Sequence, residues 1–182
     1  MPSVFGHAII GISSPYIFKT NKKYIKSILI LSIVCALIPD IDVLGFSFNV
    51  PYNSFWGHRG FTHSLLFALL FSLLLSSFYF LKKINLKLKI SIFLIFLLSI
   101  VSHSLLDALT NGGLGVALFS PFSNERIFFS YRPILVSPIG IIEFFNTRGI
   151  NVLKNEFFII GLPMLIITSL INIIKTLKNN LS

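Results

Sequence analysis

The sequence predicts an all-α fold, an integral membrane bundle of about five helical spans with a long cap loop on the extracytoplasmic side. Of the 182 residues, 54% are hydrophobic and only 12% are charged, and the mean hydropathy is +0.87. Several apolar stretches are long enough to cross a hydrocarbon core of about 30 Å as helices. The sequence shows no internal repeat and no separate soluble segment, so residues 1–182 are expected to form a single domain.

Five apolar segments define the predicted spans, and a proline and a cap residue define two of their ends. Pro39 interrupts the second segment, so its helix is expected to end or kink there and to place Asp40 and Asp42 in a local break. Thr62 is expected to cap the third helix, with His63 in its first turn. The five segments are Ser3 to Phe18, Ser27 to Leu44, Phe61 to Leu81, Leu86 to Leu109, and Phe157 to Ile174.

The basic residues predict how the bundle is oriented. The chain has a net charge of +9, and most of its lysines lie in connectors that would share one side of the membrane. The positive-inside rule makes that side cytoplasmic and accounts for the charge without a nucleic-acid partner. We therefore expect a multi-pass membrane protein in contact with membrane lipids, with the N-terminus outside. These lysines are Lys19, Lys22, Lys23, Lys26, Lys82, Lys83, Lys87, Lys89, Lys175 and Lys178.

The polar residues cluster at the ends of the apolar segments. All four histidines and three of the six acidic residues lie in these clusters, and the predicted topology puts every cluster on the outer side. Ionisable groups against hydrocarbon cost about 2.5–3.5 kcal/mol each, so their presence indicates a function. Imidazoles and carboxylates together are the ligands of a zinc-like or manganese-like ion. The candidate metal ligands are His7, Asp40, His58, His63, His103 and Asp107.

The spacing within the clusters favours convergence on one site. His103 and Asp107 are four residues apart on one predicted helix, so they can bind the same ion or simply hold each other. His58 and His63 would point about 140° apart on a continuous helix, so they converge only if the neighbouring glycines break the backbone. The alternative is that one of these two histidines merely lies at the membrane interface. The connector 110–156 is expected to fold as a cap over the site.

Two further residues are candidate catalytic groups. One of Asp40 and Asp42 is expected to bind the ion, and the other, here Asp42, to orient a histidine or act as a base. Arg59 lies near a predicted helix N-terminus, a natural place for a substrate phosphate. The ligand set exceeds the needs of one tetrahedral ion, so one or two ions are expected. Such ions lower the pKa of bound water and stabilise a displacement, which predicts metal-assisted hydrolysis.

The clusters and a later run form an ordered set of motifs along nearly the whole chain. The motifs are Gly6-His7, Leu37-Ile38-Pro39-Asp40-Ile41-Asp42, His58-Arg59-Gly60-Phe61-Thr62-His63-Ser64, His103-Ser104-Leu105-Leu106-Asp107, and Val136-Ser137-Pro138-Ile139-Gly140. This set resembles the YdjM-like family of membrane-bound metal-dependent hydrolases, of the LexA-regulated hydrolase type. The resemblance implies an inner-membrane hydrolase with a metal site similar to those of zinc-dependent phospholipases C and single-strand nucleases.

The resemblance also implies a substrate class and one more site residue. It implies hydrolysis of a phosphodiester, and a membrane location favours a phospholipid or a lipid-linked phosphate over nucleic acid. Glu156 matches a family position, which implies a carboxylate at the mouth of the last span that acts as a base or supports the ligands. The alternative for Glu156 is an ordinary acid at the membrane interface.

Two other classes of protein fit parts of the pattern. A non-enzymatic membrane protein that binds or transports metal would use the same ligands. A transporter, however, is expected to hold its ligands near the middle of the membrane and often to contain repeats, whereas this chain has neither feature. A structural membrane protein would leave the histidines at the interface without any metal.

Overall fold

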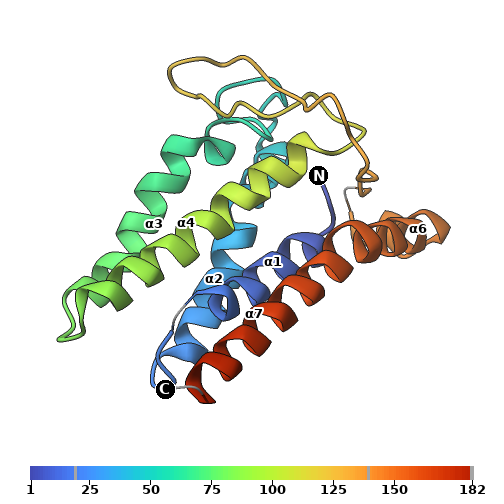
Figure 1. Cartoon of the computed structure of the whole chain (residues 1–182). Coiled ribbons are helices and arrows are strands. Elements are labelled where there is room, and N and C mark those ends of the chain that lie inside the picture. The colour runs from blue at the N-terminus through green and yellow to red at the C-terminus, as the bar shows by residue number, and fades with distance from the viewer. Residues whose placement is uncertain (19, 139, 181–182) are drawn as a thin grey trace.

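The fold is a bundle of helices with one loop-rich end. The computed structural model describes residues 1–18, 20–138 and 140–180, and within these ranges there are helices but no strand, as predicted. Figure 1 shows the main helices running side by side, with the N-terminus at the loop-rich end and the C-terminus at the other. They are α1 (Val4–Ile17), α2 (Ile25–Leu37), α3 (Leu65–Phe80), α4 (Leu86–Ala108) and α7 (Leu162–Asn180).

The helices have the length and composition of membrane segments. Three stretches are long and apolar enough to cross a membrane: Ile25–Phe48, Leu86–Ala108 and Thr147–Lys178. The other two, α1 and α3, are apolar but have only 14 and 16 residues. Many large apolar side chains on the outside of the bundle are exposed, which suits a hydrocarbon surrounding and not water. The helical membrane bundle is therefore confirmed, although two of the five predicted spans are shorter than expected.

The second span breaks at Pro39, as predicted. The α-helix α2 ends at Leu37, and a 3₁₀ helix, η1 (Ile38–Phe48), continues the chain. Proline has no backbone N–H to donate within a helix and its ring crowds the preceding turn, so the α-helical pattern cannot continue through it. Asp40 and Asp42 lie in this 3₁₀ segment.

The third helix begins later than predicted. Ser64, and not Thr62, caps α3, because the Ser64 hydroxyl accepts from the Phe67 backbone N–H at 3.0 Å. Thr62 instead donates its hydroxyl proton to Asp42 at 2.6 Å. The prediction for Thr62 was wrong because a buried carboxylate competes for its hydroxyl, and a serine two residues later can cap the helix. His63 thus ends a short 3₁₀ turn, η2 (Phe61–His63), ahead of α3.

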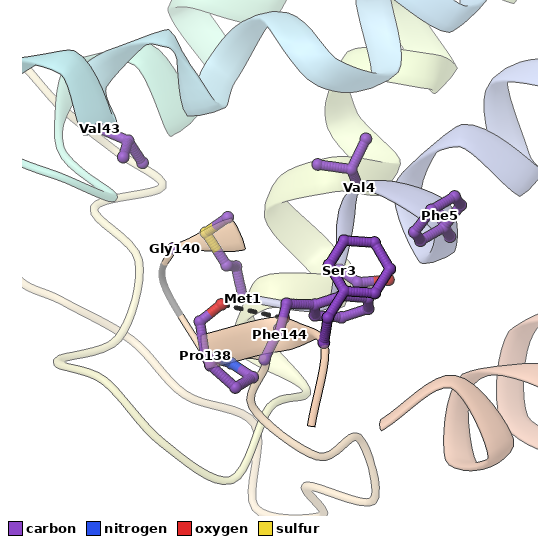
Figure 2. A pocket seen from close by; sticks show the side chains of 10 residues that line it. Met1, Ser3, Val4, Phe5, Val43, Pro138, Gly140 and Phe144 are labelled. Atoms are coloured by element: carbon purple, nitrogen blue, oxygen red, sulfur yellow. Dashed lines mark hydrogen bonds between the residues drawn. The ribbon is translucent and has the colours of Figure 1, made fainter. Parts of the chain in front are cut away.

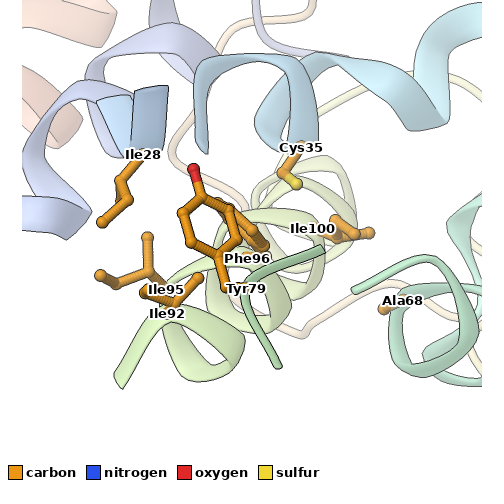
Figure 3. Packing of buried hydrophobic residues seen from close by; sticks show 8 residues of the cluster. All are labelled: Ile28, Cys35, Ala68, Tyr79, Ile92, Ile95, Phe96 and Ile100. Carbon is orange, nitrogen blue, oxygen red and sulfur yellow. The ribbon is translucent and has the colours of Figure 1, made fainter. Parts of the chain in front are cut away.

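The core of the bundle lies between α2, α3 and α4. Figure 3 shows Ile28 and Cys35 of α2 packed with Phe96 and its neighbours on α4. Small residues let α1 approach this core closely, since the Ser32 hydroxyl donates to the Gly11 carbonyl oxygen at 2.6 Å. Close approach over small side chains is typical of helix packing in membranes.

The segment after α4 covers the loop-rich end. It crosses that end as an irregular loop, enters the short helix α5 (Ile141–Phe144), and then continues as α6 (Thr147–Glu156) and a π-helical turn (Phe157–Gly161) into α7. The Leu118 carbonyl oxygen accepts from the Leu65 N–H at 3.0 Å, which ties this cap to the start of α3. The last helical run therefore begins at Thr147, earlier than the predicted Phe157, because α6 joins α7 without a break.

The lysine-bearing ends lie away from the cap. The turn between α3 and α4 and the C-terminal end of α7 both lie at the end of the bundle opposite the cap (Figure 1). The Lys175 Nζ donates to the Tyr16 carbonyl oxygen at 2.7 Å, and it also contacts the next two carbonyl oxygens, so it caps the C-terminus of α1. Lys19 lies outside the described residues.

The position of the lysines opposite the cap yields a prediction about how the protein is oriented in the membrane. Single cysteines at Asn53 or Asn124, at the capped end, should react with a membrane-impermeant maleimide in intact cells. Cysteines at Asn21 or Asn85 should react only after lysis. The native Cys35 is buried and should stay silent. The reverse labelling pattern would overturn the outward orientation but not the fold.

The packing of α1 on α2 yields a second prediction. A Cβ at Gly11 would lie 2.8 Å from both the Ile33 Cα and the Ser32 carbonyl oxygen, so Gly11→Ala must push the helices apart. Overpacking of this kind costs about 1–3 kcal/mol, and we expect a lower thermal unfolding temperature in detergent. Gly161→Ala is the matched control, because its nearest neighbour would be 3.5 Å away. Equal unfolding temperatures for the two variants would contradict the close packing of α1 on α2.

Candidate metal centre

Two glycines fold the loop before α3 so that its histidines converge. A Cβ at Gly57 or Gly60 would collide with carbonyl oxygens of the same loop, so only glycine fits at either position. Arg59, between them, has a left-handed backbone with φ of 62°. The loop therefore turns back on itself, and His58 and His63 reach the same carboxylate.

Four side chains from three elements meet at one point beneath the cap. Asp40 of η1, His63 of η2, and His103 and Asp107 of α4 each offer one ligand atom, and these atoms all lie within 4.8 Å of one another. The Nε2 atoms of His63 and His103 are 3.1 Å apart. Asp40 Oδ1 lies 3.4 Å from His103 Nε2, and Asp107 Oδ2 lies 3.4 Å from His63 Nε2. We call these four residues the central group.

The partners of the other ring nitrogens indicate which tautomer each neutral imidazole adopts. His103 Nδ1 lies 2.7 Å from the Ala36 carbonyl oxygen. His63 Nδ1 lies 3.1 Å from both Thr62 Oγ1 and Asp42 Oδ2, and because Thr62 donates its own proton to Asp42, both Nδ1 atoms act as donors. Pro39 has no N–H for the carbonyl three residues earlier, which leaves the Ala36 oxygen available to His103. In the neutral rings, both Nε2 atoms then carry lone pairs that face each other. A cation between them turns this repulsion into attraction.

The charge of the buried cluster also calls for a cation. Three carboxylates, those of Asp40, Asp42 and Asp107, lie around His63, and the Arg59 guanidinium pairs with Asp107 alone among them. The buried atoms without a hydrogen-bond partner include both oxygens of Asp40 and of Asp107 and both ring nitrogens of His7. Buried polar atoms are nearly always paired, and an ion is one of the explanations for exceptions. The donor set therefore fits a divalent cation of the zinc or manganese type.

His7 lies at the edge of the central group. Its Nε2 is 3.5 Å from Asp107 Oδ1, and its ring stacks on His103 with the centroids 3.7 Å apart. α1 supplies this residue, so a fourth element reaches the site. All four histidines of the chain are thus buried in one cluster.

Asp42 organises the neighbouring residues. Its Oδ1 lies 2.7 Å from His58 Nδ1, while its Oδ2 accepts from the Arg59 backbone N–H and from Thr62 Oγ1. Asp42, His58 and His63 also lie close enough to form a second possible metal group. Since both oxygens of Asp42 already have protein partners, the contacts suit a residue that orients imidazole rings.

Arg59 is fully buried, and its guanidinium contacts the protein itself. Its Nε lies 3.0 Å from Asp107 Oδ2, and its terminal nitrogens donate to the Gly112 carbonyl oxygen and to Thr110 Oγ1. It thereby joins Asp107 to the first residues of the cap. The sequence predicted a contact with a substrate phosphate, which stays a prediction, and each nitrogen of the side chain faces a group of the protein.

Glu156 lies away from the central group. Its carboxylate accepts hydrogen bonds from the backbone N–H and the hydroxyl of Ser3, the residue that caps α1. Its part in the described structure is to fix the start of the helix that carries His7. This placement differs from the predicted base at the site, because the unpaired donors at the start of α1 bind the carboxylate.

Several residues that shape the site were not found by sequence reasoning. Thr62 contacts His63 Nδ1 and Asp42, Ser3 caps the helix that carries His7, and the Ala36 carbonyl oxygen orients His103. The signal that could have indicated Ser3 and Ala36 is their position relative to a motif. Ser3 precedes His7 by one helical turn, and Ala36 precedes Pro39 by three residues.

Comparisons with known proteins agree with this architecture. The chain matches the family described as YdjM inner membrane protein over residues 1–178. It is also 35% identical over 174 residues to inner membrane protein YbcI of Escherichia coli (strain K12), which covers 94% of this chain and 97% of that protein. No solved structure matches. The apolar helices, the buried histidine and aspartate cluster and these two matches together lead to one conclusion: the chain belongs to the YdjM family of inner membrane proteins.

Proposed function

We propose that the protein is a membrane-bound metal-dependent hydrolase. The observation that carries the proposal is the pair of Nε2 atoms of His63 and His103, 3.1 Å apart with both Nδ1 atoms engaged as donors. Two imidazoles and two carboxylates suit zinc, and manganese is the other ion that such a set accepts. We assign one ion to the central group, with Asp42 orienting the imidazoles beside it.

The chemistry of the site follows from the roles of its residues. When bound, a divalent ion supplies a Lewis acid that lowers the pKa of water and stabilises developing negative charge. Asp42 and the Ala36 carbonyl orient the imidazoles, while Arg59 holds Asp107 in place. Asp40, the most exposed member of the central group, marks the side from which substrate enters.

We propose a phosphodiester of a membrane lipid as the substrate. In its hydrolysis a water oxygen bonds to phosphorus, one P–O ester bond breaks, and the leaving alcohol takes a proton. The support is a metal-type cluster at the end of an apolar bundle, where lipid phosphates lie. The lysines at the opposite end support a multi-pass protein whose site faces outward from the cytoplasmic membrane.

The metal assignment predicts the behaviour of three variants. His63→Ala, His103→Ala and Asp107→Ala should each lower the zinc bound after equilibrium dialysis by at least about tenfold, since each removes one ligand. Elemental analysis of the purified protein measures this. Glu125→Ala removes an exposed carboxylate and is the control. Unchanged zinc in all three variants would exclude the central group, and zinc binding without hydrolysis of any phosphodiester would favour a metal-binding or transport protein.

The contacts of Arg59 predict that it positions Asp107. Arg59→Lys keeps the charge but cannot reach Asp107, Gly112 and Thr110 together, so zinc affinity should fall by about 10- to 100-fold. Hydrolysis should recover in part at saturating zinc. The exposed Arg132→Lys is the matched control. Normal zinc affinity combined with lost turnover would point instead to a direct contact between Arg59 and the substrate phosphate.

A further inference from the structure

An apolar hollow lies at the capped end of the bundle. Its volume is about 380 Å³, within the range of about 300–1,000 Å³ for small-molecule sites. Figure 2 shows Val43 of η1 on one side, Val4 and Phe5 at the start of α1 on the other, and Phe144 of α5 between them. The hollow is therefore formed by three elements that meet only in the folded chain.

The hollow begins beside the central group. Side chains three residues apart in a 3₁₀ helix lie on the same edge, so Asp40 and Val43 share one edge of η1. Met1 also lines the hollow, and its backbone nitrogen is 3.9 Å from Asp107 Oδ1. A molecule in the hollow thus touches two wall residues, Val43 and Met1, that connect it to the central group.

Two polar groups in the wall are already paired. The Ser3 hydroxyl donates to Glu156, and the Ser137 backbone N–H donates to the Met1 carbonyl oxygen at 2.9 Å. A sugar or a nucleobase needs free donors and acceptors in its pocket, whereas a hydrocarbon chain needs none. The wall therefore suits hydrocarbon.

The mouth of the hollow continues into the apolar outer surface of the bundle. Val4 and Phe5 are 53% and 54% exposed, and Ile12 extends the same apolar exposure along α1. In a membrane bundle, lipid is the surrounding solvent for such a face. A second apolar hollow of about 250 Å³, lined by Ile9, Leu153 and Phe157, lies against the same Phe5 side chain.

We propose that the hollow binds an acyl chain of a membrane lipid and so places the lipid phosphate at the central group. The inference rests on the proposed function and makes it more specific, since it requires a substrate that carries a long hydrocarbon chain. The lipid surface that meets the outer face of α1 supplies the occupant, because the hollow is continuous with that face.

Photo-crosslinking tests the proposal without any need for turnover. The probe is a phosphatidylglycerol with a diazirine in the middle of one acyl chain, in nanodiscs of phosphatidylethanolamine and phosphatidylglycerol that contain the full chain. Mass spectrometry should find crosslinks at Val43, Pro138 or Phe144 in addition to bulk-lipid crosslinks on the outer helix faces. Val43→Trp should reduce the crosslinks in the hollow about tenfold, the loss expected when roughly two methylenes no longer reach apolar surroundings.

Two further variants make the result decisive. Phe144→Trp narrows the hollow from another wall and should reduce the same crosslinks if Val43→Trp does not fold. Val34→Trp, at a 41% exposed position of α2 away from the hollow, is the matched control and should leave them unchanged. Crosslinks confined to the outer faces, or reduced equally by all three variants, would overturn the proposal.

The proposal and the hydrolase function fail in different ways. Crosslinks in the hollow without hydrolysis of phosphatidylglycerol or of bis(p-nitrophenyl) phosphate would support the acyl-chain site and contradict the hydrolase function. Hydrolysis of phosphatidylglycerol without crosslinks in the hollow would support the hydrolase function and overturn the acyl-chain site.

Discussion

The opposed Nε2 atoms of His63 and His103 are the constraint on which the rest of the capped end depends. Each ring is held in place by an acceptor on a different element, the Ala36 carbonyl at the end of α2 for His103 and Asp42 of η1 for His63. Removing either acceptor frees a ring to rotate, and the facing lone pairs would then separate. The break after α2 therefore supplies the acceptors that orient both rings.

A buried cluster of this charge is tolerated in an apolar bundle because its members compensate one another. Isolated carboxylates would cost several kcal/mol each in such surroundings. Here Arg59 pairs with Asp107, and Asp42 accepts several hydrogen bonds. Asp40 has no comparable partner, so it contributes most of the negative charge that a cation would neutralise. The cap excludes water from these contacts and strengthens them.

Sequence reasoning reached the features that local physics determines. The break at Pro39 follows from its missing N–H, and the fold of the loop around His58 follows from glycines that no other residue can replace. Sequence reasoning also predicted that the polar clusters converge, but not which distant side chains pair with one another. Nothing near Arg59 in the sequence indicates that Asp107 will occupy its guanidinium, and nothing near Glu156 indicates that Ser3 will bind its carboxylate. In both cases a tertiary partner decides the role of the side chain.

The start of α1 connects the chemistry of the site with its surroundings. Glu156 fixes Ser3 at the head of this helix, and one turn later the same helix brings His7 to Asp107. Between these two points, Val4 and Phe5 form a wall of the apolar hollow. A shift of α1 therefore moves a candidate ligand and a hollow wall together. Because one short helix carries both features, the distance between His7 and this wall of the hollow is fixed by the covalent chain and does not depend on how the other helices pack.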